Sequence, residues 1–251
     1  MKKVIISVIL LFTLTVVNSQ PIDSLWQQGN QAYTESNFTV AAEKYEAILA
    51  LGVESPDVYF NLGNAYYKQN IIGSSILNYE RALRLSPDNL DVLRNLNMAK
   101  LLQLDKIEEV PEFVLSKWYS SVLQITTSNK WGIISIILFA AFLLLLMVYF
   151  FTRSYGLRKL SFITSVLALF LCVITIVFAS QQRNIQLDNS QAIIFSPVVT
   201  VKGSPDAKST DLFIIHEGLK VKIIDQIGDW YRILLSDGNQ GWAPAESMQR
   251  I

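Results

Sequence analysis

The sequence predicts a multidomain protein in which an all-α repeat array, a two-helix transmembrane hairpin and a small all-β domain follow one another. Three observations predict this fold class. Residues recur at a spacing of 34 positions between 20 and 104, and two long runs without ionisable side chains follow between 131 and 180. Short β-branched and aromatic runs, broken by turn residues, fill 181–251. The chain has 251 residues, 51% of them apolar, and the hairpin explains much of that high fraction.

Two apolar runs organise the rest of the chain. Residues 131–152 (22 residues) and 160–180 (21 residues) contain no Asp, Glu, Lys, Arg or His. About 20 helical residues cross a bilayer core, and their backbone groups must be satisfied within the segment. We therefore expect two transmembrane helices joined by the loop 153–159. The alternative is a pair of buried helices in a soluble protein, but two such runs in succession are rare outside membranes.

The N-terminus has the pattern of a secretory signal peptide over residues 1–19. Lys2 and Lys3 precede an apolar stretch, and Val17 and Ser19 occupy the small-residue positions before a cleavage site. An uncleaved anchor helix is the alternative. Either segment exports the chain from residue 20 onward, so the first hairpin helix returns it and the loop 153–159 lies inside. The net charge of +3 on that loop agrees with this orientation, because positive charge favours the cytoplasmic side. Residues 181–251 then lie outside.

The remaining charge distribution excludes several classes of function. Residues 20–130 carry 9 Lys/Arg against 13 Asp/Glu, a net of −4, and residues 181–251 carry 7 against 8, a net of −1. Neither block has the basic surface that nucleic-acid binding requires. The single cysteine, Cys172, lies in the second apolar run, so no intramolecular disulfide can form. His216 has no obvious catalytic partners and is expected to be structural.

Motifs of catalysis are missing from the sequence. We find no nucleotide-binding glycine loop, no zinc-ligand spacing and no nucleophile elbow. We therefore expect no catalytic, cofactor-binding or metal-binding residues, and no enzymatic activity.

The 34-residue spacing indicates two copies of one helical unit. The recurring pairs are Gly29 and Gly63, Asn30 and Asn64, Tyr33 and Tyr67, Tyr45 and Tyr79, Glu46 and Glu80, Leu49 and Leu83, and Leu51 and Leu85. This period and residue order resembles the tetratricopeptide repeat. The resemblance implies that residues 20–104 form two helix pairs, 22–55 and 56–89, followed by a capping helix over 89–104. A cap is needed because a single pair cannot bury its own apolar face.

The repeat register also predicts a groove. In such arrays the first helix of each pair lines a concave surface, and its exposed positions here are Trp26, Gln27, Asn30, Tyr33, Phe60, Asn61, Asn64, Tyr67 and Lys68, followed by Arg94 and Asn95 on the cap. Asparagine can donate to and accept from the backbone of an extended peptide. The alternative for any one position is a residue common to the repeat that has no binding role. No run of Lys/Arg is present to clamp a terminal carboxylate, which argues against a receptor for chaperone tails.

Residues 105–130 are expected to form an amphipathic linker helix. An acidic stretch, 105–112, holds Pro111 and suits a turn. Apolar residues then follow at helical spacing: Phe113, Val114, Trp118, Tyr119, Val122 and Leu123. Two alternatives remain open, namely a helix lying in the membrane interface with Trp118 at headgroup level, and a further soluble helix packed on the repeats.

The sequence of the C-terminal region predicts a small β domain. The expected strands are 192–195, 198–202, 212–215, 219–225, 230–235 and 241–243, with Gly- and Asp-containing turns between them. The order Glu217-Gly218, Val221, Asp229-Trp230, Asp237-Gly238, Gly241-Trp242 and Ile251 resembles bacterial SH3-like domains, which implies a small barrel over 181–251. Trp230 and Trp242 are the candidates for a ligand-stacking face. The alternative is that these tryptophans complete the core of the barrel.

The order of these modules resembles a known family. The segments NLGNAY (61–66), LRNLNMAK (93–100) and GWAP (241–244) carry the likeness to the E-type members of the Bat (aerotolerance operon) proteins of the Bacteroidetes. The resemblance implies a non-enzymatic, multi-pass protein of the bacterial inner membrane, with repeats and SH3-like domain both periplasmic. It also implies companion Bat proteins with von Willebrand A domains as partners, and a role in aerotolerance or envelope stress.

Three functions are candidates for this arrangement. The first is a scaffold that binds protein partners through the periplasmic repeats. The second is a cell-wall sensor whose SH3-like domain binds peptidoglycan. The third, a transporter or channel subunit, has little support because neither apolar run contains an ionisable residue.

Overall fold

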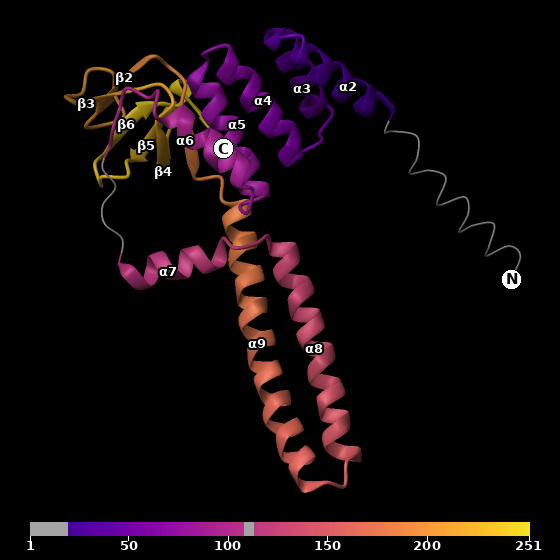
Figure 1. The fold of residues 1–251 in the computed structure, drawn as a ribbon. Helices are drawn as coiled ribbons and strands as arrows, with labels where there is room; N and C mark the ends of the chain where they lie inside the picture. Colours follow the sequence, from indigo (N-terminus) through magenta and orange to yellow (C-terminus); the bar gives the residue numbers. More distant parts are fainter. Residues whose placement is uncertain (1–19, 108–112) are drawn as a thin grey trace, which may run out of the picture. The chain divides into compact units, whose positions relative to one another are not determined.

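The computed structural model describes residues 20–107 and 113–251 of the chain (Figure 1). The predicted signal peptide, residues 1–19, lies outside the described residues, as do residues 108–112 of the linker. The chain divides into two compact units. The first joins the helical repeats up to Ala82 to Asp91–Ile107 and to Gln191–Ile251. The second comprises Leu83–Leu90 and Glu108–Ser190. Each unit is described below by itself.

The repeat region is a succession of antiparallel helices. Their bounds are α2 (Gln20–Thr34), α3 (Phe38–Ala50), α4 (Pro56–Lys68), α5 (Ile72–Leu85) and α6 (Leu90–Lys100). A core shared by α2, α3 and α4 includes Ala41, Tyr45, Ile48, Leu62 and Ala65, all at most 2% exposed. The predicted all-α array is confirmed.

The repeat is visible in the backbone as well as in the sequence. The turns between the first and second helix of each pair place Ser36 at φ 62° and Asn70 at φ 61°, again 34 positions apart. Gly29 and Gly63 lie against the rings of Tyr45 and Tyr79, where an added Cβ would come within 2.7 Å of a ring carbon. Only glycine allows this close approach of first to second helix.

Two long apolar helices form the hairpin of the second unit. Helix α8 (Ser128–Phe151) and helix α9 (Tyr155–Leu187) are each long and apolar enough to cross a membrane. They lie side by side (Figure 1) and are in contact with each other. Helix α9 runs seven residues beyond the uncharged run, because neither Gly nor Pro occurs between Ser180 and Leu187 to end it.

Small side chains line the seam between α8 and α9. Ser161, Ser165, Ala168, Cys172 and Thr175 are buried on one side of α9 at intervals of three or four residues. The Cys172 thiol lies 3.4 Å from the carbonyl of Ser135 on α8, and the Ser128 hydroxyl donates to the carbonyl of Ala179 at 2.9 Å. Small residues allow close backbone approach between membrane helices. The large apolar side chains point outward, as in helices that face lipid, so the structure supports association with a membrane.

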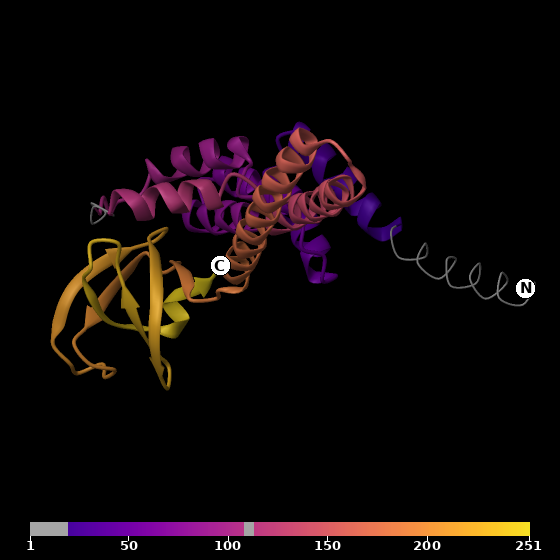
Figure 2. The same cartoon turned by 90° about the horizontal axis from the view of Figure 1, so that it is seen from below.

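The C-terminal region, called the sheet domain below (Gln191–Ile251), is an antiparallel sheet of seven strands. In sheet order these are β3 (Asp211–His216), β2 (Val198–Lys202), β6 (Gln240–Pro244), β5 (Trp230–Leu234), β4 (Lys220–Ile227), β1 (Gln191–Ile194) and β7 (Met248–Arg250). The strands curve around a shared core that includes Val201, Ile215 and Ile233 (Figure 2). The predicted small all-β fold is confirmed, while β7, a three-residue strand beside β1, was not predicted.

Within the first unit, the sheet domain and the helical array share a polar contact. The carboxylate of Glu80 on α5 pairs with Lys220 of β4 at 2.7 Å and with Lys100 of α6 at 3.1 Å. Asp105, after α6, accepts a hydrogen bond from the backbone amide of His216 at 2.6 Å, and its other oxygen lies 2.8 Å from the His216 ring. His216, expected to be structural, therefore contacts the segment that follows the array.

Candidate functional site

The groove candidates come from three helices whose neighbours are linked by asparagine side chains. Asn61 on α4 donates to Asn30 on α2 at 3.3 Å, and Asn95 on α6 donates to Asn64 on α4 at 2.7 Å. Helices α2, α4 and α6 therefore lie next to one another, as expected for the first helices of successive repeats and the cap. All of the predicted groove residues belong to these three helices.

Each link is part of a three-residue chain that repeats with the array. The Tyr45 hydroxyl donates to Oδ1 of Asn30 at 2.8 Å, and the Tyr79 hydroxyl donates to Oδ1 of Asn64 at 2.7 Å. Oδ1 of each central asparagine thus accepts two hydrogen bonds. The first chain, Tyr45–Asn30–Asn61, and the second, Tyr79–Asn64–Asn95, are related by 34 positions at every member. We call them the first and second asparagine triads.

Burial keeps the tyrosines of both triads in their donor form. Burial raises the pKa of Tyr45 to about 12, although its bond with Asn61 acts in the opposite direction. Burial likewise raises the pKa of Tyr79. Both hydroxyls therefore keep their protons near neutral pH and donate to the asparagine carbonyl oxygens. In the part of the chain that the structure describes, the Nδ2 amide of Asn64 has no partner, so it is available to donate to another molecule.

The second triad borders a pocket of about 270 Å³. Five of the predicted groove residues line it, together with two that sequence reasoning did not select. The predicted ones are Tyr33, Asn64, Tyr67, Lys68 and Asn95, and the additional ones are Tyr79 and Met98. Tyr79 could have been found as the member of the 34-residue pattern that approaches Gly63. Met98 has no counterpart in that pattern.

The other predicted groove residues lie outside this pocket. The Trp26 ring packs on Tyr45, with centroids 5.7 Å apart, and the Phe60 ring packs on Tyr79 at 6.1 Å. Asn30 and Asn61 belong to the first triad. The guanidinium of Arg94 pairs with Asp91 one turn away on its own helix, and the Gln27 side chain is exposed. The candidates therefore divide into a pocket set and a flanking set.

The sheet domain separates its two candidate tryptophans. Trp242 on β6 is buried and only 8% exposed, so little of its ring can meet a ligand. Trp230, at the start of β5, is half-buried and lines a second pocket of about 500 Å³. That pocket also includes Thr200, Lys202, Pro244 and Glu246.

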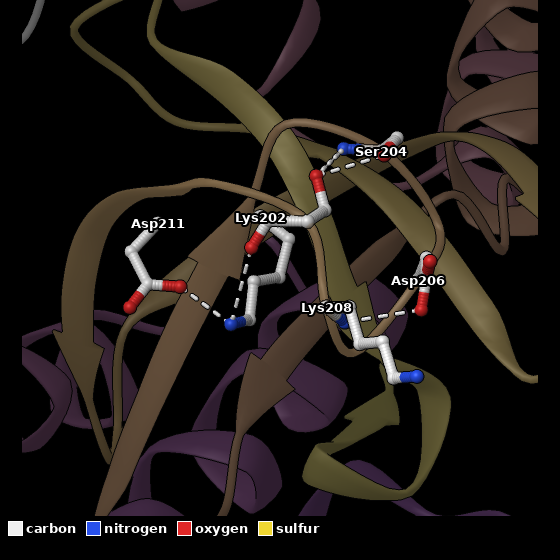
Figure 3. Close-up of polar contacts among 6 residues, drawn as sticks. Lys202, Ser204, Asp206, Lys208 and Asp211 are labelled. Carbon is white, nitrogen blue, oxygen red and sulfur yellow. Dashed lines mark hydrogen bonds and ion pairs between the residues drawn. The ribbon is translucent and has the colours of Figure 1, made fainter.

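A loop braced by its own polar contacts borders the second pocket (Figure 3). The Lys202 ammonium pairs with Asp211 at 2.5 Å, which compensates its charge. The Ser204 amide donates to the Ser209 hydroxyl at 3.0 Å, and the Lys208 amide donates to Asp206 at 3.0 Å. This loop carries Ala207, another pocket residue. Its geometry is thus set by the loop itself before any ligand binds.

The described ranges contain no cluster of three or more His, Cys, Asp or Glu side chains that could hold a metal ion. The polar groups of the side chains that line both pockets are amides, hydroxyls, one indole, one carboxylate and two amines. Such groups bind by hydrogen bonding and ion pairing.

Comparison with known proteins identifies one of the modules. A family model described as the tetratricopeptide repeat matches residues 56–89, the second repeat. The chain is also similar to mouse protein O-mannosyl-transferase TMTC1, at 35% identity over 86 residues. That match covers 34% of this chain and 9% of the mouse protein, so the chain spans less than a tenth of the length of this relative.

Proposed function

We propose that this protein is a non-enzymatic membrane scaffold whose helical array binds an extended segment of a partner protein. One observation carries the proposal: the second asparagine triad presents the Asn64 amide at a preformed pocket beside Tyr67 and Lys68. Tetratricopeptide repeats are protein-interaction modules, which supports the same reading. An amide donor can pair with a backbone carbonyl, the tyrosine ring can cover an apolar side chain, and the lysine can pair with a carboxylate.

The setting proposed for this scaffold follows from the membrane hairpin and the Bat resemblance. We infer a multi-pass protein of the bacterial inner membrane, with the repeats and the sheet domain both in the periplasm. The sheet domain then has the SH3-like identity that its sequence suggested. The partners would be companion Bat membrane proteins with von Willebrand A domains, in an aerotolerance or envelope-stress complex. The apolar hairpin and the cationic loop 153–159 support this orientation.

A conservative substitution tests the groove directly. Asn64→Asp keeps the oxygen that accepts from Tyr79 and Asn95 but replaces the amide donor with a second acceptor. We expect it to weaken partner binding about tenfold, because an unsatisfied buried hydrogen-bonding group costs roughly 1–3 kcal/mol. Tyr67→Ala should weaken binding similarly. Recovery of the partner after crosslinking in native membranes, followed by mass spectrometry, measures the effect.

The first triad supplies a matched control for this experiment. Asn30→Asp makes the same chemical change in the same hydrogen-bond pattern, but Asn30 lies outside the pocket. Partner recovery should therefore stay at the wild-type level. Equal recovery with Asn64→Asp, Tyr67→Ala and the wild type would rule out the groove as the binding site.

The pocket at Trp230 favours a second function, namely binding of cell-wall peptidoglycan. An indole wall beside hydroxyl groups and the Glu246 carboxylate suits a ligand with sugar rings and polar peptide groups. We expect the detergent-solubilised full chain to co-sediment with purified sacculi, and Trp230→Ala to reduce the bound fraction. Ile224→Ala serves as the control, because Ile224 is an exposed residue of β4 and no residue of that strand lines the pocket. A full chain that stays in the supernatant would remove this function.

A further inference from the structure

Helix α7 (Val114–Leu123) carries an exposed apolar face that the protein-binding function does not use. Val114 is 76% exposed, Leu115 65% and Trp118 64%. By helical spacing, Ser116 and Ser120 lie on the opposite side of the same helix, with Lys117 beside them. In water this distribution would leave several large apolar side chains uncovered on one short helix.

The polar side of α7 is only weakly charged. Lys117 is the one charged residue between Val114 and Leu123, and it is cationic. The hydroxyls of Ser116 and Ser121 donate to backbone carbonyls of their own helix, at Phe113 and Lys117, both at 2.8 Å. These hydroxyls are therefore already satisfied without water. A helix with a single positive charge and satisfied hydroxyls suits a partly dehydrated, anionic surface.

Contacts within the second unit attach α7 to one end of the hairpin. Leu123 is buried, and its carbonyl accepts a hydrogen bond from the Trp131 indole of α8 at 3.3 Å. The Phe178 ring of α9 meets Trp131 at 5.1 Å and Tyr119 of α7 at 5.8 Å, both edge to face. Figure 1 shows α7 leading sideways from this end of α8 and α9.

The position of this aromatic cluster corresponds to the edge of a bilayer. Helix α8 has 24 residues and is about 36 Å long, slightly more than a hydrocarbon core of roughly 30 Å. Its first turn, with Trp131, therefore reaches the headgroup level, where Trp and Tyr are enriched. A helix attached there and leading sideways runs along the membrane surface.

We propose that α7 lies in the headgroup–acyl boundary of the membrane that the hairpin spans, with Val114, Leu115 and Trp118 inserted among the acyl chains. The leaflet is the one at the end of the hairpin opposite the loop 153–159. The occupant of this apolar face is thus lipid. This apolar face is continuous with the lipid-facing surface of the hairpin itself. It differs from the protein-binding groove in its binding partner, which is lipid, and in its location on α7.

Site-directed spin labelling of the full chain in lipid nanodiscs tests this arrangement. Cys172→Ala removes the native thiol, and single cysteines then replace Leu115 or Trp118 on one face, and Ser116 or Lys117 on the other. Nanodiscs of phosphatidylcholine and phosphatidylglycerol provide the bilayer. Collisions of the label with oxygen, which concentrates in lipid, are compared with collisions with a water-soluble nickel chelate. We expect labels at 115 and 118 to favour oxygen, and labels at 116 and 117 to favour nickel.

Two other results would overturn the proposal. Labels at 115 and 118 that collide with nickel as often as the label at 116 would place this face in water. Labels at 115 and 118 that are shielded from both reagents would show that protein covers the face. Continuing the scan from 114 to 122 checks the helix itself, because only an intact interfacial helix alternates with a period of three to four residues.

Discussion

Glu80 shows how one residue position acquires a role that its repeat partner lacks. Glu46 occupies the equivalent place 34 residues earlier, is exposed, and accepts a hydrogen bond from the Tyr66 hydroxyl. The Glu80 side chain is only 9% exposed and lies between the Lys220 and Lys100 ammonium groups. Burial alone raises the pKa of Glu80, but the two lysines outweigh burial, and the pKa lies below its ordinary value.

The lysines should matter more to stability than the glutamate does. Lys220 and Lys100 are 34% and 39% exposed, so without Glu80 they can turn to water. Without both lysines, the carboxylate stays buried and unpaired, which costs about 3–5 kcal/mol. We therefore expect Lys100→Met with Lys220→Met to lower the thermal unfolding midpoint more than Glu80→Gln. Circular dichroism of the purified full chain measures this, and the opposite order would contradict the argument.

The same cluster predicts a pH dependence. A carboxyl whose pKa is lowered by folding stabilises the folded state above its ordinary pKa of 4.5, and this stabilisation is lost as the pH falls through the lower folded value. The wild type should therefore lose stability on acidification below about 4.5. Glu80→Gln should lose less over the same range, because it has no carboxyl to protonate at this position. If the stability of the two proteins depended on pH in the same way, a contribution from the Glu80 carboxylate and its lysines would be excluded.

The helical elements follow from local pattern, whereas one strand, β7, does not. The 34-residue period predicts both helix pairs, because the same contact between helices occurs in each pair. Gly29 packs against Tyr45, and Gly63 packs against Tyr79. Strand β7 pairs only with β1, more than fifty residues earlier in the chain. Its three residues are too few to show an alternating pattern, so its strand state depends on a neighbour that the local sequence does not reveal.

The exposure of the two tryptophans of the sheet domain could not be predicted from their local sequence either. Both lie in β-type segments beside Gly or Asp, so their sequence surroundings are alike. In the structure Trp242 pairs with Lys202 on one neighbouring strand and with Arg232 on the other, in the interior of the sheet order. Trp230 is the first residue of β5 and lines the second pocket. Exposure was decided by strand order and register, which depend on long-range packing.

At the scale of the whole molecule, the orientation in the membrane is the central expectation. Even numbers of crossings between two positions leave them on the same side. Reporter fusions after residues 104, 156 and 251 should therefore read outside, inside and outside, because export of residue 20 onward and the cationic loop 153–159 require this arrangement. Alkaline phosphatase and green fluorescent protein fusions measure it. An inside reading at 251 would reverse the placement of the sheet domain.

The sequence by itself determined the kinds of module and their order. Repeat period, apolar run length and strand-like alternation are local properties, and each predicted its module because secondary structure follows such periods closely. The register also led to Tyr33, Asn64, Tyr67, Lys68 and Asn95, which line one pocket. Only the tertiary structure decided that the Asn64 amide has no partner among the described residues, that Trp230 rather than Trp242 is accessible, and that Glu80 meets a lysine 140 positions away. Those features depend on which distant side chains share one buried environment, and packing determines that.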